Sequence, residues 1–203
     1  MTNDQQSFIP YGRQSITEND IAAVTQVLRS SFLTQGPMVP AFEQDVANKV
    51  RALHGVAANS ATSALHVACL ALGVKKGDLV WTSPISFVAS SNCALYCGAE
   101  VDFVDIDPKT YNISCERLEE KLILAKKLGR LPKVVIPVHF CGQPCDMRTI
   151  YELSKIFGFH IIEDASHAIG AEYESKKVGV GKFSNITVFS FHPVKIITSG
   201  EGG

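Results

Sequence analysis

Three short segments carry polar side chains of the kinds that bind anions or form covalent bonds. The small residues Asn59-Ser-Ala-Thr-Ser63 open a helical run, and backbone N–H groups at such a helix start can bind phosphate. Asp164 directly follows the apolar pair Ile161-Ile162 and Glu163, and a carboxylate at the end of a buried strand needs a cationic or hydrogen-bonding partner. Lys195 lies five residues after Ser190. A lysine there becomes a nucleophile if desolvation removes its proton.

Each segment also has an ordinary explanation when it is taken alone. Residues 59–63 could be a simple helix cap, and Lys195 could be a solvated surface side chain. Asp164 could cap a helix or anchor a loop, or it could hold a metal, a substrate amine or a protonated ring nitrogen. Together, however, a lysine for a Schiff base, an acid for a pyridinium nitrogen and donors for a phosphate match the needs of pyridoxal 5′-phosphate (PLP).

Alternating strands and helices are expected to position these segments. Apolar runs predict strands over 79–82, 101–104, 134–138, 160–163 and 186–190, and the apolar segment 55–58 is expected to be a further strand. Periodic patterns predict helices over 18–28, 39–52, 64–72, 87–96, 115–128 and 147–157. Thr17, Ser114 and Asp146 are expected to cap three of these helices, and Gly158 is expected to end the last of them. Short apolar strands between helices indicate a mostly parallel sheet with helices on both faces, in one large α/β domain. Ligands bind at the carboxyl ends of such strands, which is where the three segments fall.

Composition excludes several other classes of protein. The 203 residues include 19 basic and 20 acidic side chains, for a net charge of −1, which argues against a nucleic-acid or polybasic membrane surface. Hydrophobic residues make up 46% and charged residues 19%, so the chain can build a core. No apolar stretch is long enough to span a membrane, and the first residues do not resemble a signal peptide. We therefore expect a soluble cytoplasmic protein.

The cysteines raise the question of a metal site. Two pairs, Cys93/Cys97 and Cys141/Cys145, have a spacing of four residues, which could belong to a zinc site. Cys93 and Cys97 lie near a predicted helix end, where cysteine commonly serves as a small core residue. We expect neither a metal site nor a disulfide scaffold.

Glycine patterns separate the remaining enzyme classes. No Gly-x-Gly-x-x-Gly fingerprint follows a strand, and no Gly-Lys-Ser/Thr loop is present. This disfavours a nicotinamide oxidoreductase and a nucleoside triphosphatase. A non-catalytic module that binds ligand in the same pocket stays open as an alternative, although a nucleophilic lysine favours an enzyme.

Five longer motifs carry a resemblance to a known family. They are Leu33-Thr-Gln-Gly36, Asn59-Ser-Ala-Thr-Ser-Ala-Leu65, Thr82-Ser-Pro-Ile-Ser-Phe-Val-Ala89, Glu163-Asp-Ala-Ser-His-Ala168 and Ser190-Phe-His-Pro-Val-Lys-Ile-Ile-Thr-Ser-Gly-Glu-Gly-Gly203. With these motifs the chain resembles the DegT/DnrJ/EryC1/StrS sugar aminotransferases, PLP enzymes of the aspartate aminotransferase-like fold (fold type I). The second and third motifs are most similar to the branch of the family that makes an intermediate to pseudaminic acid.

The resemblance implies roles for residues that bind the cofactor. Lys195 would form the Schiff base and then move a proton between the substrate and the cofactor. Asp164 would keep the ring nitrogen protonated, and Phe87 would stack on the ring unless it is a core aromatic. The other implied cofactor contacts are phosphate donors and one polar neighbour of the ring, namely Ala61, Thr62, Ser190 and His167.

Substrate and assembly also follow from the resemblance. Tyr11 and Thr34 match positions that face the substrate in relatives, although both could be ordinary surface or packing residues. The implied reaction moves an amino group, with glutamate as the usual donor, to C4 of a UDP-4-keto-6-deoxy-N-acetylhexosamine in a homodimeric enzyme.

Relatives of this kind continue for about as long again beyond the position that matches Gly203. The resemblance therefore implies that residues 1–203 form an N-terminal segment and most of the PLP-binding large domain, with the C-terminal small domain absent. The chain alone is accordingly expected to have little or no transaminase activity, because a productive site must be held tightly.

Overall fold

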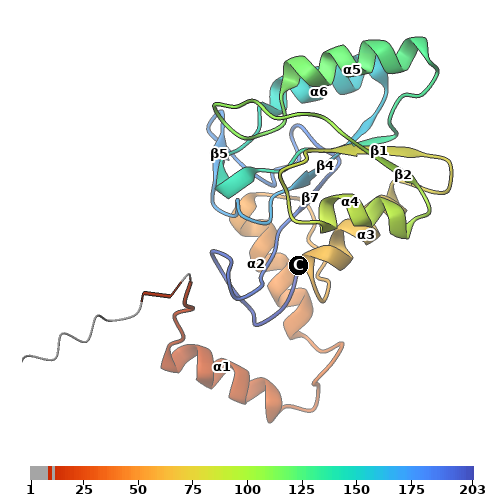
Figure 1. Ribbon diagram of the computed structural model, residues 1–203. Coiled ribbons are helices and arrows are strands. Elements are labelled where there is room, and N and C mark those ends of the chain that lie inside the picture. Colours follow the sequence, from red (N-terminus) through yellow and green to blue (C-terminus); the bar gives the residue numbers. More distant parts are fainter. Residues whose placement is uncertain (1–8, 11) are drawn as a thin grey trace, which may run out of the picture.

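The computed structural model describes residues 9, 10 and 12–203 (Figure 1). Its helices are α1 (Glu18–Leu28), α2 (Met38–Val50), α3 (Ala61–Ala71), α4 (Ala89–Tyr96), α5 (Cys115–Lys127) and α6 (Met147–Phe157), with a short 3-10 helix at Phe140–Gly142. Its strands are β1 (Leu79–Thr82), β2 (Glu100–Phe103), β3 (Val134–Ile136), β4 (His160–Asp164), β5 (Glu172–Tyr173), β6 (Lys176–Lys177) and β7 (Ile186–Val188).

A parallel sheet forms the centre of the molecule. Five strands lie in the order β2-β1-β3-β4-β7, and each pairs in parallel with its neighbours. The register places Val80 beside Val134 and Ile162 beside Ile186. All carboxyl ends therefore meet at one edge, as the sequence predicts. The short strands β5 and β6 form a separate antiparallel pair.

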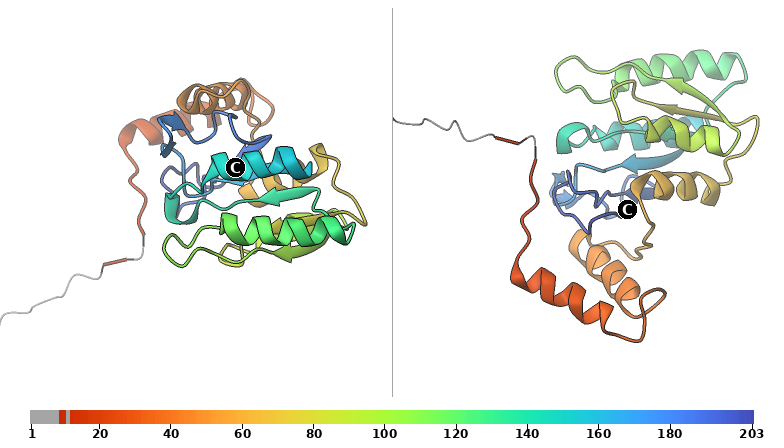
Figure 2. Two further views of the ribbon diagram at one scale, coloured as in Figure 1. Left: turned by 90° about the horizontal axis from the view of Figure 1, so that it is seen from above. Right: turned by 60° about the horizontal axis from the view of Figure 1, so that its bottom comes forward.

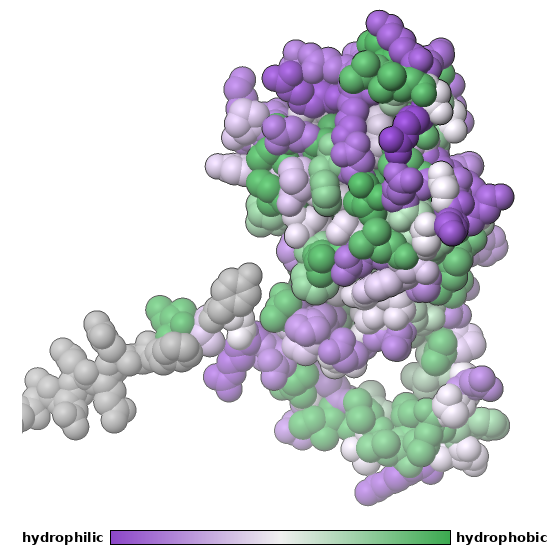
Figure 3. All heavy atoms as spheres, turned by 45° about the vertical axis from the view of Figure 1, so that its right-hand side comes forward, coloured by the Kyte–Doolittle hydropathy of each residue, from purple (hydrophilic) through white to green (hydrophobic). Residues whose placement is uncertain are grey.

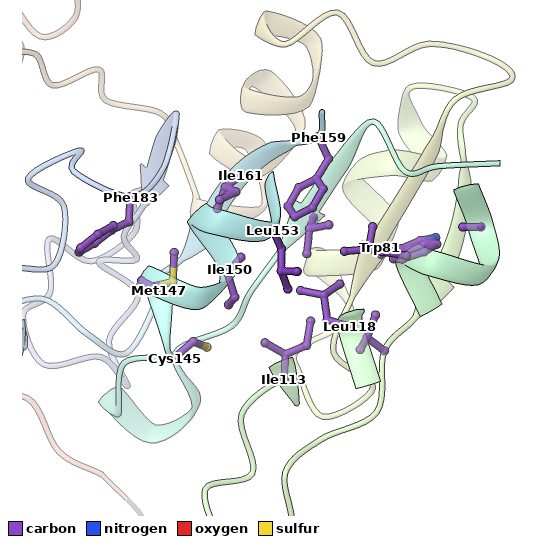
Figure 4. Close-up of a cluster of buried hydrophobic side chains, with 14 residues drawn as sticks. Trp81, Ile113, Leu118, Cys145, Met147, Ile150, Leu153, Phe159, Ile161 and Phe183 are labelled. Atoms are coloured by element: carbon purple, nitrogen blue, oxygen red, sulfur yellow. The ribbon is translucent and has the colours of Figure 1, made fainter. Parts of the chain in front are cut away.

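Alternate residues of the same strands enter two different cores. Val80 packs on the side of α3 and α4, whereas the next residue, Trp81, packs on the side of α5 and α6. Figure 4 shows Trp81 with Leu118 and Leu153 from these two helices. In Figure 1, α5 and α6 lie above the sheet, and α3 and α4 lie below it. The predicted covering of both faces by helices is confirmed, and it explains why the central strands are mostly apolar on both sides.

The N-terminal helix lies outside this layered body. Thr17 caps α1 as predicted, and Asp20 completes a capping box with it. No residue of α1 is buried, and both views in Figure 2 show α1 apart from the sheet and its covering helices. Figure 3 shows hydrophobic side chains gathered over this end of the molecule. They include the exposed side chains of Ile21, Val24, Leu28, Phe32 and Leu33.

One expected strand does not form. Residues 55–58 have no strand structure. Only Ala58 makes a strand-like pair, exchanging backbone hydrogen bonds with Gly203 at 2.8 and 3.1 Å. A strand needs a neighbour along its length, and a single glycine does not provide one. An apolar groove of about 750 Å³ lies beside this segment, lined by side chains of α2, α3 and β7.

The start of α5 offers a local test of the structure. Ser114→Ala is expected to lower the free energy of unfolding by about 1 kcal/mol, because Ser114 Oγ accepts the backbone N–H of Arg117 at 3.2 Å. Urea denaturation measures the change. Ser114→Asp keeps an acceptor at this position and should retain nearly all the stability. An equal loss in both variants would contradict the capping role.

Candidate active site

Asp164 is the buried polar residue at the centre of the candidate site. It is the last residue of β4 and is only 4% exposed. Its Oδ1 accepts hydrogen bonds from the Ser166 backbone N–H at 3.2 Å and the Ser166 hydroxyl at 2.6 Å. Its Oδ2 accepts the hydroxyl of Ser90, in α4, at 2.6 Å. The carboxylate is therefore held at both oxygens. Oδ1 already accepts two hydrogen bonds, whereas Oδ2 accepts one and has capacity for a further donor.

Lys195 lies against His167, 28 residues earlier in the chain. Its Nζ is 2.7 Å from His167 Nε2. Burial lowers the pKa of Lys195 below its ordinary value, and the negative charge of Asp164 acts in the opposite direction. Burial and the positive charge of Lys195 also lower the pKa of His167. The site therefore favours a neutral imidazole whose Nε2 accepts a hydrogen bond from Lys195 Nζ, and the lowered pKa brings the lysine closer to its nucleophilic, neutral form.

The start of α3 presents free backbone donors. Ser60 caps this helix, and its Oγ accepts the Ser63 N–H at 3.1 Å. Among the residues that the structure describes, the N–H groups of Ala61 and Thr62 have no hydrogen-bond acceptor, as is usual in a first helical turn. Free N–H groups in a first helical turn are donors from which an anion can accept hydrogen bonds.

Backbone hydrogen bonds link this helix start to the segment that follows β7. Phe191 N–H donates to the carbonyl of Gly202 at 2.9 Å, and Ala58 pairs with Gly203. Ser190 immediately precedes Phe191 and is only 5% exposed. Its Oγ accepts the His192 N–H at 3.5 Å. Through Gly202 and Gly203, these hydrogen bonds connect the segment after β7 to the residues just before α3. The buried hydroxyl of Ser190 lies in that connected segment.

Gly203 is required for this close approach. A Cβ built at this position would lie 2.3 Å from the backbone nitrogen of Ala61 and 2.5 Å from its Cα. Backbone atoms cannot move aside as the end of a side chain can. The final glycine of the Gly-Glu-Gly-Gly motif is therefore explained by contact with the start of α3.

The remaining expected residues lie elsewhere. Phe87 is 74% exposed in the connection between β1 and α4, so it is not a core aromatic. Thr34 is exposed in the connection between α1 and α2. Tyr11 lies outside the described residues. The structure therefore brings Lys195 together with His167, whereas Thr34 lies in a separate, exposed segment.

Two polar pairs were not identified from the sequence. The first pair is the hydrogen bond from Ser90 to Asp164. The only local sequence signal for it is that Ser90 follows Ser86 by one helical turn. The second is His139, whose Nε2 lies 2.7 Å from Glu163 Oε2 in the core. The partners are 74 residues apart in the first pair and 24 residues apart in the second. No sequence spacing indicates such contacts.

Metal and membrane features were also sought in the described part of the chain. Cys93 is buried in α4, as expected for a core residue, and the six cysteines are free thiols. Within residues 9, 10 and 12–203, no cluster of three or more histidine, cysteine or acidic side chains could hold a metal ion. None of the helices described there is long and apolar enough to cross a membrane.

Comparison with known proteins identifies the family. The model of the DegT/DnrJ/EryC1/StrS aminotransferase family matches residues 14–203. The UDP-4-amino-4,6-dideoxy-N-acetyl-beta-L-altrosamine transaminase of Campylobacter jejuni is 42% identical over 195 residues, which are 96% of this chain and 50% of that protein. The chain spans about half the length of the curated relatives that it matches.

Solved structures agree in fold. Helicobacter pylori PseC, an aminotransferase involved in the biosynthesis of pseudoaminic acid, superposes with a TM-score of 0.86 and 34% identity over 95% of this chain and 50% of its own. Streptococcus pneumoniae Spr1654, solved in PLP and PMP forms, superposes with a TM-score of 0.85 and 30% identity over 96% of this chain. The PLP-form match covers 52% of that structure. The expected aspartate aminotransferase-like fold is confirmed, and the chain belongs to the DegT/DnrJ/EryC1/StrS aminotransferase family.

Proposed function

We propose that this chain is the cofactor-binding part of a PLP-dependent sugar-nucleotide aminotransferase. Residues 1–203 supply an N-terminal segment and most of the large domain in this proposal. The observation that carries it is the Lys195 amine, 2.7 Å from His167, in the same site as the buried carboxylate of Asp164. A binding module needs no nucleophile, so this arrangement favours an enzyme over a purely binding role.

The described residues fit PLP by their donor and acceptor chemistry. Asp164 provides a buried carboxylate for a protonated ring nitrogen, and its oxygens are already oriented by other donors. The N–H groups of Ala61 and Thr62 suit a phosphate at a helix start, and the hydroxyl of Ser190 can add a further donor. When bound, PLP supplies an electron sink that stabilises negative charge on the substrate carbon.

The side chains of this chain then have distinct tasks. Lys195 Nζ holds the cofactor covalently and later moves a proton between the substrate carbon and the cofactor carbon. His167 Nε2 accepts a hydrogen bond from this amine and orients it. Phe87, whose ring is exposed, stacks on the cofactor in this proposal. Thr34 and Tyr11 contact the sugar nucleotide in this proposal.

We infer the substrate class from the relatives. The named activity of the Campylobacter relative supports a UDP-4-keto-6-deoxy-N-acetylhexosamine as amino acceptor at C4, and the family supports an amino acid donor, with glutamate as our choice. The structural similarity to PseC, an aminotransferase involved in the biosynthesis of pseudoaminic acid, supports a role in the same biosynthesis. We further propose a cytoplasmic homodimer, in which a second copy completes the substrate site.

Cofactor capture and turnover can be tested separately. The purified chain is mixed with PLP, reduced with borohydride, digested and mapped by mass spectrometry. An adduct on Lys195 supports the cofactor site, and its absence in a folded chain would contradict the site. Amino transfer from glutamate to the UDP-keto-sugar is then measured with the chain alone and with a full-length relative as positive control. We expect transfer by the relative, and little or none by the 203 residues alone.

A further inference from the structure

A line of serine hydroxyls leads from the Phe87 loop to Asp164. Ser90 is fully buried in α4, and its hydroxyl donates to Asp164 Oδ2 at 2.6 Å. Ser86 Oγ lies 2.6 Å from Ser90 Oγ. Because the single proton of Ser90 is used on Asp164, Ser86 is the donor between the two serines. The Ser86 hydroxyl has a second acceptor in the Phe87 carbonyl oxygen, 3.0 Å away, so its one proton is shared between the two. The loop that carries Phe87 is therefore connected by hydrogen bonds to the carboxylate.

The two oxygens of Asp164 are held from different elements. Oδ1 is bound within its own segment, by the backbone and side chain of Ser166. Oδ2 is bound by Ser90, which is 74 residues away in the sequence. The Ser166 hydroxyl can follow a rotation of the Asp164 side chain, because it belongs to the same turn, whereas the Ser166 backbone N–H stays fixed. The Ser90 contact cannot follow, since α4 packs against β1 and α3 through buried residues such as Cys93 and Ala94.

We propose that Ser90 is a positioning residue that sets the orientation of the Asp164 carboxylate toward the ring nitrogen of PLP. This inference rests on the proposed function, since it concerns the same cofactor. The hydrogen bond from Ser90 occupies one lone pair of Oδ2. The other lone pair would then be available to the ring N–H of PLP. Without Ser90, Ser166 alone restrains the carboxylate, through Oδ1, and Oδ2 can shift away from the direction in which the ionic hydrogen bond to the ring needs it. Charge-assisted hydrogen bonds are strong only when that geometry is kept.

The experiment compares three serine variants of the 203-residue chain by PLP titration and by the absorbance band of the bound cofactor. Ser90→Ala is expected to weaken PLP binding about tenfold and to shift the band. Ser90→Thr retains the hydroxyl and should restore both properties. Ser91→Ala is the matched control, because Ser91 lies on the same helix and its hydroxyl donates to the Val88 carbonyl. It should leave binding within about twofold of wild type.

The band position distinguishes positioning from a general loss of structure. A variant that is merely less stable binds less cofactor but shows the wild-type band for the fraction bound. Wild-type affinity and an unchanged band in Ser90→Ala would overturn the proposal, and so would equal effects of Ser90→Ala and Ser91→Ala. If Ser90→Ala does not fold, Ser86→Ala tests the same connection from the partly exposed end of the line, with the same direction of shift expected.

A cofactor-free measurement separates this inference from the proposed function. The carboxyl carbon of Asp164 is followed by NMR in the chain without PLP. Its chemical shift should change in Ser90→Ala and stay unchanged in Ser91→Ala, because Ser90 donates to the carboxylate and Ser91 donates to the Val88 carbonyl. Failure of the wild-type chain to bind PLP would refute the proposed function alone. An unchanged Asp164 signal in Ser90→Ala would refute the positioning role alone.

Discussion

Replacing Lys195 with alanine is expected to abolish the borohydride-stable adduct of PLP. The Nζ of Lys195 is the nucleophile of the site, and it is held 2.7 Å from His167 Nε2. Alanine has no amine with which to form the bond, so the loss should be complete and not partial. Mass mapping of the reduced protein measures it. Lys195→Arg should behave in the same way, because a guanidinium keeps the charge but stays protonated.

A control lysine makes this result specific. Lys109→Ala removes an exposed amine in the turn after β2, and it should leave the adduct at Lys195 at wild-type level. An adduct of wild-type amount in Lys195→Ala would show that another amine captures the cofactor. That outcome would remove the basis of the proposed function.

The pH dependence of adduct formation follows from the environment of Lys195. The neutral amine is the reactive form, so the rate rises with pH through the pKa of the lysine. Burial lowers this pKa below the ordinary value of 10.5, despite the opposing charge of Asp164. The rate should therefore reach its plateau at a lower pH than for a free lysine side chain. A pH profile identical to that of the side-chain amine of Nα-acetyl-lysine would contradict the partial burial of Lys195.

Replacing Glu163 with alanine should cost the fold about 3–5 kcal/mol of unfolding free energy. Glu163 is buried between two groups of donors. His139 Nδ1 accepts the Cys145 N–H at 3.2 Å, so its Nε2–H donates to Glu163 Oε2 at 2.7 Å. Glu163 Oε1 accepts the hydroxyls of Ser184 and Thr187. Removing the carboxylate leaves these buried donors unpaired and opens a cavity.

The same carboxylate should make stability depend on pH. Burial by itself raises the pKa of Glu163, but hydrogen bonds from His139, Ser184 and Thr187 outweigh it and lower the pKa below the ordinary value of 4.5. The contribution of Glu163 is therefore present above pH 4.5 and is lost as the pH falls through the folded-state pKa. Wild type should lose stability in this acid range. Glu163→Gln, which keeps the volume but cannot ionise, should lose less between the same pH values.

Urea denaturation at neutral and acid pH checks both effects. Glu119→Ala is the matched control, because Glu119 is an exposed acid on α5. The free energy of unfolding of Glu119→Ala should stay within about 0.5 kcal/mol of the wild-type value. A loss in Glu163→Ala no greater than in this control would show that the buried network contributes no net stability.

Local signals in the sequence predicted the elements of the fold well. The caps at Thr17, Ser114 and Asp146 and the left-handed glycine at Gly158 all lie where the sequence places them. The reason is physical, because a cap or a C-terminal glycine acts on backbone groups only a few residues away. The strand expected over 55–58 was wrong because a strand depends on its neighbour. Along most of that segment the described chain provides none.

The chemistry of the site was also present in the sequence as residue types in order along the chain. A small-residue helix start, an acid after a buried strand and a lysine after another strand indicated a cofactor site. For the acid and the lysine, placement at one sheet edge followed from the rule that parallel strands share the direction of their carboxyl ends. The helix start follows no strand in the described chain and is connected to the segment after β7 by the hydrogen bonds between Ala58 and Gly203. The sequence by itself therefore determined the elements, the fold class and the identity of the groups that can react.

Only the tertiary structure decided which of these groups touch. Ser90 reaches Asp164, Lys195 reaches His167, and His139 reaches Glu163 across 74, 28 and 24 residues. Such contacts depend on the register of neighbouring strands and on how each helix packs on the sheet. These features are set by the interlocking of many side chains in two separate cores and not by any local pattern. The proton affinities of Lys195 and Glu163 follow from the same packing, because it alone determines which side chains lose contact with water.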